Sequence, residues 1–177
     1  MDFLKTGYFK YYIPLKAYAT YENFETKLDF IGLNYYSHPL LKMQISYSEP
    51  LYSSCYDGQE MSDYQFRLYP EGLYRAIEEI SALEVPIYIT ENGIPDNNDT
   101  KRSLFINRYL YSLSKAIEDG FDVRGYFYWT LIDNFEWNEG FSVKFGLYDV
   151  DLDTQKRTLK PGASAYKNII DKWKNIK

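Results

Sequence analysis

The stretch Val85-Pro86-Ile87-Tyr88-Ile89-Thr90-Glu91-Asn92-Gly93 decides how this chain folds. Residues 87–90 form a short run with β-branched side chains, which predicts a buried strand and is too short for a helix. Asn92-Gly93 is a strong turn signal, so we expect the strand to stop at Glu91. Parallel α/β proteins carry their chemistry at the carboxyl ends of the strands. The other interpretation of Glu91 is a helix cap or an ion-paired Glu near a helix start.

Two other apolar runs end in the same way. A strand predicted over 30–34 runs into Asn34, Tyr35 and Tyr36, and a strand over 123–129 runs into the polar and aromatic segment 129–137. Apolar side chains at helical spacing predict helices over 71–83, 103–119 and 163–174. Alternating strands and helices indicate right-handed βαβ crossovers and a parallel sheet, and therefore the α/β fold class.

The remaining segments carry weaker signals. Residues 1–27 are rich in Tyr and Lys, and we expect an irregular connection that could include one short helix. Residues 37–70 predict a long loop with a short hairpin, and residues 153–157 predict a hairpin turn. We expect Gly120 to cap the second helix and the apolar faces to include Ile117, Ile169 and Trp173. No Gly-, Ser- or Pro-rich linker interrupts the sequence, which predicts a single domain over residues 1–177.

Composition restricts the class of function. The net charge is −5, with no long run of one sign, which disfavours nucleic acid or an anionic membrane as a partner. No stretch approaches the roughly 18 consecutive apolar residues of a membrane-spanning helix. The single Cys55 and the single His38 exclude an internal disulfide and a His-rich metal site, so we expect no cofactor. The single cysteine and the absence of a signal-peptide pattern predict a cytoplasmic protein.

Aromatic residues make up 19% of the chain, and they include 20 Tyr. Tyr and Trp combine a flat apolar face with a polar tip, which suits sugar rings as well as protein cores. Neighbouring parallel strands lie about 4.8 Å apart, so the three strand ends can share one cleft. Two carboxylates among aromatic and amide side chains suggest a carbohydrate substrate. Retaining glycoside hydrolysis needs two carboxyl groups about 5–5.5 Å apart, and this argument alone would pair Glu91 with Glu136.

Five motifs together resemble the carboxyl-terminal part of glycoside hydrolase family 1, the β-glucosidase and β-galactosidase family. They occur in family order and are Asp29-Phe30-Ile31-Gly32-Leu33-Asn34-Tyr35-Tyr36, Tyr69-Pro70-Glu71-Gly72-Leu73, Ile89-Thr90-Glu91-Asn92-Gly93, Tyr128-Trp129-Thr130-Leu131-Ile132-Asp133-Asn134-Phe135-Glu136-Trp137 and Lys144-Phe145-Gly146-Leu147. The resemblance implies a partial TIM (β/α)8 barrel that comprises barrel strands 6 to 8 with their helices. Residues 28–177 are the matching region, and residues 1–27 are a connecting segment.

The resemblance implies roles for seven residues. Glu91 would be the catalytic nucleophile, and Tyr36 would hydrogen-bond to its carboxylate and orient it. Glu136 would accept hydrogen bonds from sugar hydroxyls, which replaces the Glu91–Glu136 catalytic pair suggested above. The other substrate-binding residues would be Asn34 near the acid/base carboxylate, Trp129 under the sugar ring, Trp137 as an indole N–H donor and Phe145 beside the hydroxymethyl group.

The resemblance also predicts which parts of the family's active site are not found in this sequence. The Asn-Glu-Pro segment that bears the acid/base Glu is not found in the 177 residues, nor are the sugar-binding Gln and His of the first barrel strand. Met1 would lie in the connection between the fifth and sixth barrel strands. Three βα units cannot close a barrel, so strand edges and apolar surface would be exposed. A complementary N-terminal barrel fragment, or self-association through these edges, would cover them.

We therefore predict hydrolysis of β-glycosidic bonds in unphosphorylated β-glucosides or related β-glycosides by retaining double displacement. General acid catalysis supplies about 10²–10⁴-fold, so the isolated chain is expected to be inactive or nearly so on natural β-glycosides. One alternative is an inactive carbohydrate-binding or regulatory remnant. The other is a 6-phospho-β-glycosidase, a class whose members replace the residue at Glu136 with a small one and add basic residues. A carboxylate at that position would repel a dianionic phosphate.

Overall fold

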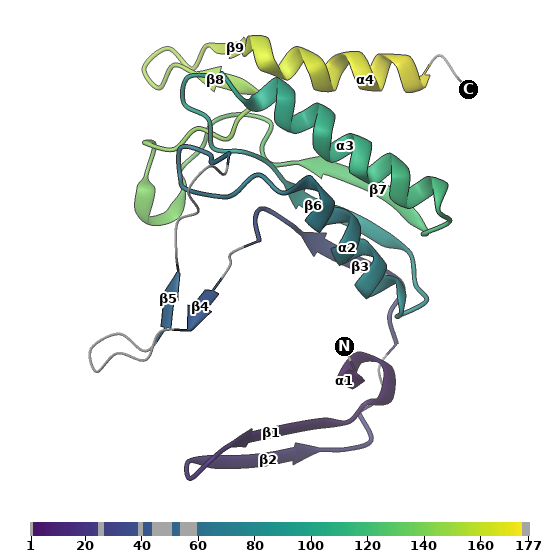
Figure 1. Cartoon of the computed structure of the whole chain (residues 1–177). Coiled ribbons are helices and arrows are strands. Elements are labelled where there is room, and N and C mark those ends of the chain that lie inside the picture. Colours follow the sequence, from purple (N-terminus) through teal and green to yellow (C-terminus); the bar gives the residue numbers. More distant parts are fainter. Residues whose placement is uncertain (1, 25–26, 39–40, 44–50, 54–59, 175–177) are drawn as a thin grey trace.

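The computed structural model describes residues 2–24, 27–38, 41–43, 51–53 and 60–174. A three-stranded parallel sheet in the order β3-β6-β7 forms its centre, and three helices pack beside it (Figure 1). The strands are β3 (Ile31–Asn34), β6 (Ile87–Asn92) and β7 (Val123–Tyr128). The helices are α2 (Pro70–Ser81), α3 (Arg102–Glu118) and α4 (Ser164–Lys174). The predicted α/β alternation is therefore confirmed.

Strand β6 extends further than the turn signal predicted. It includes Glu91 and ends at Asn92, because the parallel ladder with β7 continues to the pair Asn92–Tyr128. On the other side of β6, Asn34 of β3 is paired with Glu91 after a register shift that follows Leu33. Glu91 and Asn92 are therefore paired with the last residue of β3 and the last residue of β7, respectively.

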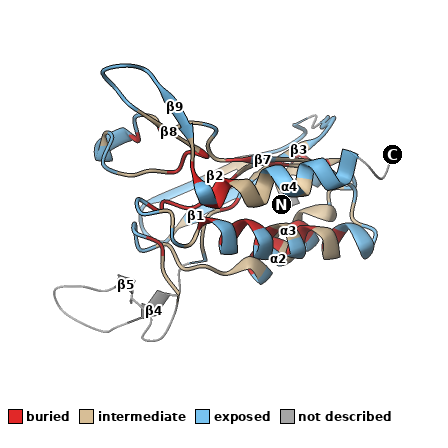
Figure 2. Ribbon diagram, turned by 90° about the horizontal axis from the view of Figure 1, so that it is seen from above, coloured by how far each residue is buried: buried red, intermediate tan, exposed pale blue. Residues whose placement is uncertain are grey.

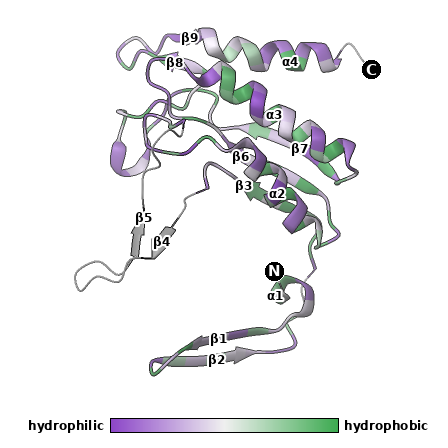
Figure 3. Cartoon of the chain, in the orientation of Figure 1, coloured by the Kyte–Doolittle hydropathy of each residue, from purple (hydrophilic) through white to green (hydrophobic). Residues whose placement is uncertain are grey.

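The helices cover one face of the sheet (Figure 2). Alternate β6 residues, Ile87 and Ile89, are buried against them, whereas Thr90 is exposed on the opposite face. Green hydrophobic bands recur between purple hydrophilic ones along α3 (Figure 3), and the buried residues of this helix include Phe105, Ile106 and Tyr109. The fully buried apolar side chains of α2, α3 and the sheet are Leu73, Ile77, Ile87, Ile89, Phe105, Ile106, Tyr109 and Ala116. The uncovered face is the side that a closed barrel would turn inward.

Two helix faces differ from the prediction. Ile117 and Trp173 were expected to be buried but are 42% and 60% exposed. The reason is an open groove between α3 and α4, about 590 Å³ in volume, which both side chains line. The predicted cap at Gly120 is confirmed: its φ is +94°, and the following amide of Phe121 donates to the carbonyl of Ala116.

The N-terminal segment is more regular than expected. Helix α1 (Asp2–Thr6) is followed by β1 (Phe9–Ile13) and β2 (Ala17–Tyr21), which form an antiparallel hairpin. The short helix agrees with the prediction. The expectation that the rest is irregular is wrong, because the hairpin carries aromatic side chains on both faces and so lacks the apolar–polar alternation that signals a strand. The hairpin lies apart from the parallel sheet (Figure 1).

Two shorter hairpins agree with the sequence analysis. Strands β4 (Leu41–Met43) and β5 (Leu51–Ser53) are antiparallel within the predicted long loop, of which residues 39–40, 44–50 and 54–59, Cys55 included, lie outside the described residues. Strands β8 (Tyr148–Val150) and β9 (Arg157–Leu159) are antiparallel around the predicted turn. Single 3-10 turns are η1 (Trp137–Glu139) and η2 (Pro161–Ala163). In the described part of the chain, no helix is long and apolar enough to cross a membrane.

Candidate active site

Backbone hydrogen bonds bring the three strand ends together. The amide of Tyr35, just after β3, donates to the carbonyl of Glu91 at 2.9 Å. On the other side, the amide of Trp129, just after β7, donates to the carbonyl of Asn92 at 3.0 Å. The peptide bond that follows Trp129 is cis. These contacts place the side chains of Tyr36, Glu91 and Trp129 at the carboxyl edge of the sheet.

Tyr36 and Glu91 form a direct hydrogen bond. The Tyr36 hydroxyl donates to Oε2 of Glu91 at 2.6 Å, and both side chains are half-buried. Burial, followed by the hydrogen bond to Glu91, raises the pKa of Tyr36 well above its ordinary value of 10.0. Tyr36 therefore stays protonated at neutral pH and remains a donor. The ring of Phe145 meets the ring of Tyr36 edge-on at 6.0 Å and supports its position.

A pocket of about 360 Å³ opens over this pair. Six of the seven predicted site residues line it, together with five others, and its lining is Tyr36, Tyr64, Phe66, Glu91, Trp129, Glu136, Trp137, Asn138, Glu139, Val143 and Phe145. The structure does not bring Asn34 into the pocket. Its side chain is exposed and accepts a hydrogen bond from the Thr90 hydroxyl at 2.6 Å.

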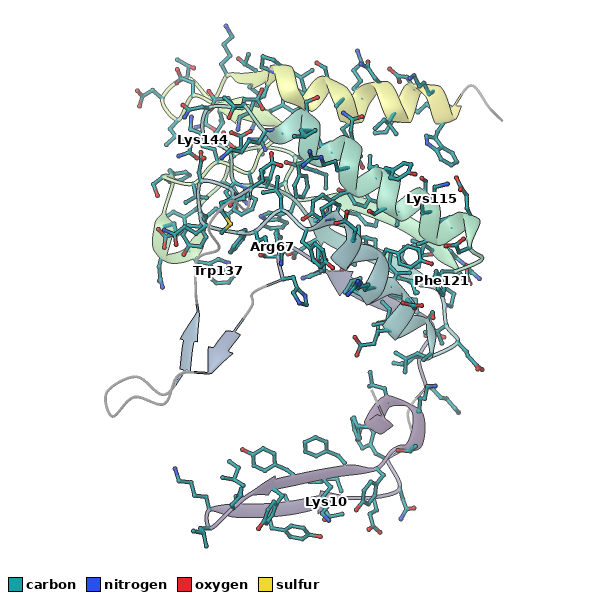
Figure 4. All side chains as sticks on the ribbon, viewed as in Figure 1. Lys10, Arg67, Lys115, Phe121, Trp137 and Lys144 are labelled. Carbon is teal, nitrogen blue, oxygen red and sulfur yellow. The ribbon has the colours of Figure 1, made fainter. Side chains whose placement is uncertain are left out.

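Glu136 and Trp129 form a second polar pair. The indole N–H of Trp129 donates to Oε1 of Glu136 at 3.2 Å, and Glu136 is buried. Trp137, by contrast, is 86% exposed. Figure 4 shows Trp137 on the same side of the molecule as Lys144, whereas Lys115 and Phe121 lie at the opposite end of α3. The pocket therefore has a buried carboxylate inside and an exposed indole at its rim.

Five pocket residues were missed by sequence reasoning, namely Tyr64, Phe66, Asn138, Glu139 and Val143. Tyr64 and Phe66 lie in the long loop, and Glu139 lies just beyond the motif that ends at Trp137. The Tyr64 hydroxyl donates to Oε1 of Glu139 at 3.0 Å, which joins the loop to η1 across the pocket rim. The loop is held in place because the Asp63 carboxylate accepts a hydrogen bond from the backbone amide of Asn97 at 2.8 Å. The only signal in the sequence for this side of the pocket was the presence of two aromatic residues, Tyr64 and Phe66, shortly before the Tyr69-Pro70 motif.

No metal site accompanies the pocket in the described residues. There, no group of three or more His, Cys, Asp or Glu side chains is arranged to hold a metal ion. The pocket offers carboxylates, two phenols and indoles, which suit hydrogen bonding to hydroxyl groups and nucleophilic attack by a carboxylate.

Gly93 gives the first prediction about this site. A Cβ at Gly93 would overlap the carbonyl oxygen of Trp129. Gly93→Ala is therefore expected to lower the free energy of unfolding by about 1–3 kcal/mol and to displace Trp129 from the pocket. Urea denaturation monitored by tryptophan fluorescence measures both effects. Gly32→Ala is the control, because its Cβ would meet only the Thr90 side chain at 3.0 Å. Equal losses in the two variants would contradict the prediction.

Glu136 gives a pH-dependent prediction. Burial and the nearby charge of Glu91 raise its pKa above the ordinary 4.5. Between the two values the folded chain binds more protons than the unfolded chain, so the free energy of unfolding falls as the pH rises through this window. Glutamine does not ionise, so Glu136→Gln does not lose stability over this pH window. The free energy of unfolding of the variant, minus that of the wild type, should therefore be larger at neutral pH than at pH values below the ordinary pKa. Urea midpoints of both proteins at the two pH values test this, and an unchanged difference would refute it.

The fold and the pocket define a class of protein. Parallel βα units with a polar pocket at the carboxyl ends of their strands are the arrangement of TIM-barrel enzymes, and the chain is part of such a barrel. The described strands do not close the barrel. The sequence pattern of glycosyl hydrolase family 1 matches residues 13–175. The chain belongs to this family, which confirms the resemblance drawn from its motifs.

Individual relatives agree with this assignment. A beta-galactosidase of Pyrococcus woesei is 39% identical over 164 residues, which are 80% of this chain and 31% of that protein. A beta-glycosidase from Pyrococcus horikoshii superimposes with a TM-score of 0.80 at 38% identity, covering 95% of this chain and 39% of that chain. The beta-glucosidase from Thermotoga maritima in complex with castanospermine gives 0.75 at 33% identity, covering 82% and 35%. The chain spans about a third of the length of these relatives.

Proposed function

We propose that this chain carries the nucleophile and most of the sugar-binding surface of a retaining β-glycosidase that acts on unphosphorylated β-glucosides or related β-glycosides. The observation that carries the proposal is the 2.6 Å hydrogen bond from Tyr36 to Glu91 at the floor of a pocket walled by aromatic side chains. Family membership and relatives that are beta-galactosidases and beta-glucosidases support it.

In the proposed mechanism, Glu91 attacks the anomeric carbon. A bond forms between a carboxylate oxygen and that carbon while the bond to the aglycone oxygen breaks, and the departing oxygen takes a proton from a general acid. Tyr36 holds Oε2 of Glu91, which leaves Oε1 to attack. Water then hydrolyses the glycosyl–enzyme ester and regenerates Glu91, so two easier displacements replace a single difficult one.

The sugar would bind through polar and aromatic contacts. Glu136 accepts hydrogen bonds from sugar hydroxyls, and Trp129 lies under the ring and holds Glu136 through its indole N–H. Trp137 donates its indole N–H to a further hydroxyl, and Phe145 packs beside the hydroxymethyl group. The proposed role of Asn34 near the acid/base group depends on residues outside the pocket described above.

The charge of the pocket supports a neutral substrate. Its lining includes the carboxylates of Glu91, Glu136 and Glu139, and no Lys, Arg or His is among the described residues that line it. A dianionic phosphate would be desolvated beside three carboxylates without a cation to pair with. The 6-phospho-β-glycosidase alternative therefore gains no support from the pocket.

We further propose that the uncovered face of the sheet is covered by a complementary N-terminal barrel segment or by a second copy of the chain, and that the acid/base carboxyl comes from the covering segment. That face carries an aromatic patch in which Phe30 meets Tyr88 edge-on at 5.4 Å. Phe30 and Phe127 are more than half exposed. A patch of this kind on one face of a parallel sheet is normally buried.

An activated inhibitor tests the central proposal. The 2,4-dinitrophenyl 2-deoxy-2-fluoro-β-glucoside has a leaving group that departs without protonation, so labelling does not need the general acid. We expect a mass increase of one fluoroglucosyl unit, located by peptide mapping on Glu91. Labelling only after addition of strands 1–5 of a family relative would support the covered-face proposal. Sugar binding without labelling in either case would favour an inactive carbohydrate-binding remnant and refute the glycosidase.

A further inference from the structure

Asn92 is the last residue of β6 and directly follows Glu91, yet it does not line the pocket. Its side chain is fully buried, and both ends of its amide are hydrogen-bonded. The Nδ2 group donates to the carbonyl of Tyr35 at 2.6 Å, and Oδ1 accepts the hydroxyl of Tyr126 at 2.8 Å. Asn92 therefore joins the end of β3 to β7 through its side chain, across β6.

These bonds restrain the residue that precedes Tyr36. The backbone of Tyr35 is held on both sides, because its amide donates to Glu91 and its carbonyl accepts from Asn92. The regular ladder between β3 and β6 has shifted register after Leu33 and pairs no residue beyond Asn34. The side-chain amide of Asn92 thus supplies a connection at the point where strand pairing ends.

We infer that Asn92 is a positioning residue, which fixes the end of β3 so that the Tyr36 hydroxyl reaches Oε2 of Glu91. This inference rests on the proposed function insofar as it concerns catalysis, while the hydrogen-bond geometry stands without it. Among the pocket contacts, the Tyr36–Glu91 bond is the one that spans two strand ends, so it depends on their relative position.

The chemistry of the two partners explains why an amide suits this position. Burial raises the pKa of Tyr126 well above 10.0, so its hydroxyl stays protonated and can donate to Oδ1. The carbonyl of Tyr35 can only accept, so it needs the NH₂ end of the amide. A side chain with a donor and an acceptor on opposite ends meets both demands, whereas a carboxylate would place an oxygen against the Tyr35 carbonyl.

The first experiment measures the Tyr36 hydroxyl directly and does not need activity. In the full chain with ¹³C-labelled tyrosine, the Cζ signal of Tyr36, assigned by its loss in Tyr36→Phe, reports the hydrogen bond to Glu91. In Asn92→Ala we expect this signal to move toward that of the exposed tyrosines. Tyr126→Phe, which removes only the bond to Oδ1, should give a smaller shift in the same direction, and it remains informative if Asn92→Ala does not fold. An unchanged Tyr36 signal in the folded variants would overturn the inference.

The second experiment measures the consequence for the nucleophile. For labelling by the fluoroglucoside, Asn92→Ala is expected to lower the inactivation rate constant roughly 10- to 100-fold, as a displacement of about 1 Å does, and to leave the inhibitor binding constant nearly unchanged. Tyr36→Phe should add little in the Asn92→Ala background, because the bond that it removes is already lost. Asn107→Ala, on the exposed surface of α3, is the control for the substitution itself.

The two experiments separate the possible failures. If the wild-type chain is not labelled, alone or with added barrel strands, the proposed function fails, and the Tyr36 signal still decides the role of Asn92. If labelling occurs and Asn92→Ala loses only stability, with the inactivation rate constant and the Tyr36 signal of the folded protein unchanged, Asn92 is a structural residue and the inference is overturned.

Discussion

Replacing Glu91 by glutamine is expected to abolish covalent labelling by the fluoroglucoside, with a loss of at least about 10³-fold in rate. The amide oxygen of glutamine is a poor nucleophile, whereas its size and its ability to accept the Tyr36 hydrogen bond are kept. Because Glu91 is only half-buried, we expect no large change in the free energy of unfolding. Intact-protein mass spectrometry over time measures the rate, and circular dichroism verifies the fold.

Glu139→Gln is the matched control for Glu91→Gln. It makes the same chemical change in the same pocket, but at an exposed residue that the Tyr64 hydroxyl contacts. We expect this variant to keep most of the labelling rate. If Glu139→Gln or Glu136→Gln abolished labelling while Glu91→Gln did not, the nucleophile would be wrongly assigned.

The comparison of Glu91 with Glu136 shows how much the positions of two carboxylates in the sequence can predict. Two carboxylates near neighbouring strand ends suggested a catalytic pair, and they do line the same pocket. Their hydrogen bonds differ, however: Glu91 accepts from a phenol and Glu136 from an indole. Residue types in sequence predict that the side chains meet, but only the motifs suggested different roles for them.

The parallel sheet was predictable because its signal is local. The runs ending near Asn34, Glu91 and Trp129 are apolar over strand length, and the intervening helices show helical spacing. The N-terminal hairpin was not predictable in this way, since its aromatic residues lie on both faces and no apolar face alternates with a polar one. A strand without a clear buried face has no period to detect.

The residues missed in and beneath the pocket share a different cause. Tyr64 and Phe66 reach the pocket only because a long loop folds back onto the turn after β6. Arg102 was placed outside the helix predicted to start at residue 103, and a charged residue at a helix start is normally taken as exposed. In the structure Arg102 begins α3 and its side chain is completely buried. Such positions depend on tertiary contacts between distant segments.

Replacing Arg102 by methionine is expected to lower the free energy of unfolding by about 3–5 kcal/mol. The guanidinium pairs with Asp99 at 2.8 Å and donates to the Tyr128 hydroxyl at 2.8 Å. It also donates to the backbone carbonyls of Ile94, Asp96, Lys144 and Phe145. Methionine fills similar space but leaves these carbonyls and the Asp99 carboxylate without their donor, and unpaired buried acceptors are costly.

Arg108→Met provides the comparison on the same helix. Arg108 is half-exposed and, within the described part of the chain, pairs with Glu60, so its loss should cost no more than about 1 kcal/mol. Urea unfolding of both variants measures the difference. Because Arg102 holds the carbonyl of Phe145, whose ring supports Tyr36, the Arg102 variant should also label more slowly than the Arg108 variant under conditions where both are folded. If the two variants unfolded at the same urea concentration, the network around Arg102 would not be the connection that fixes the pocket wall to α3.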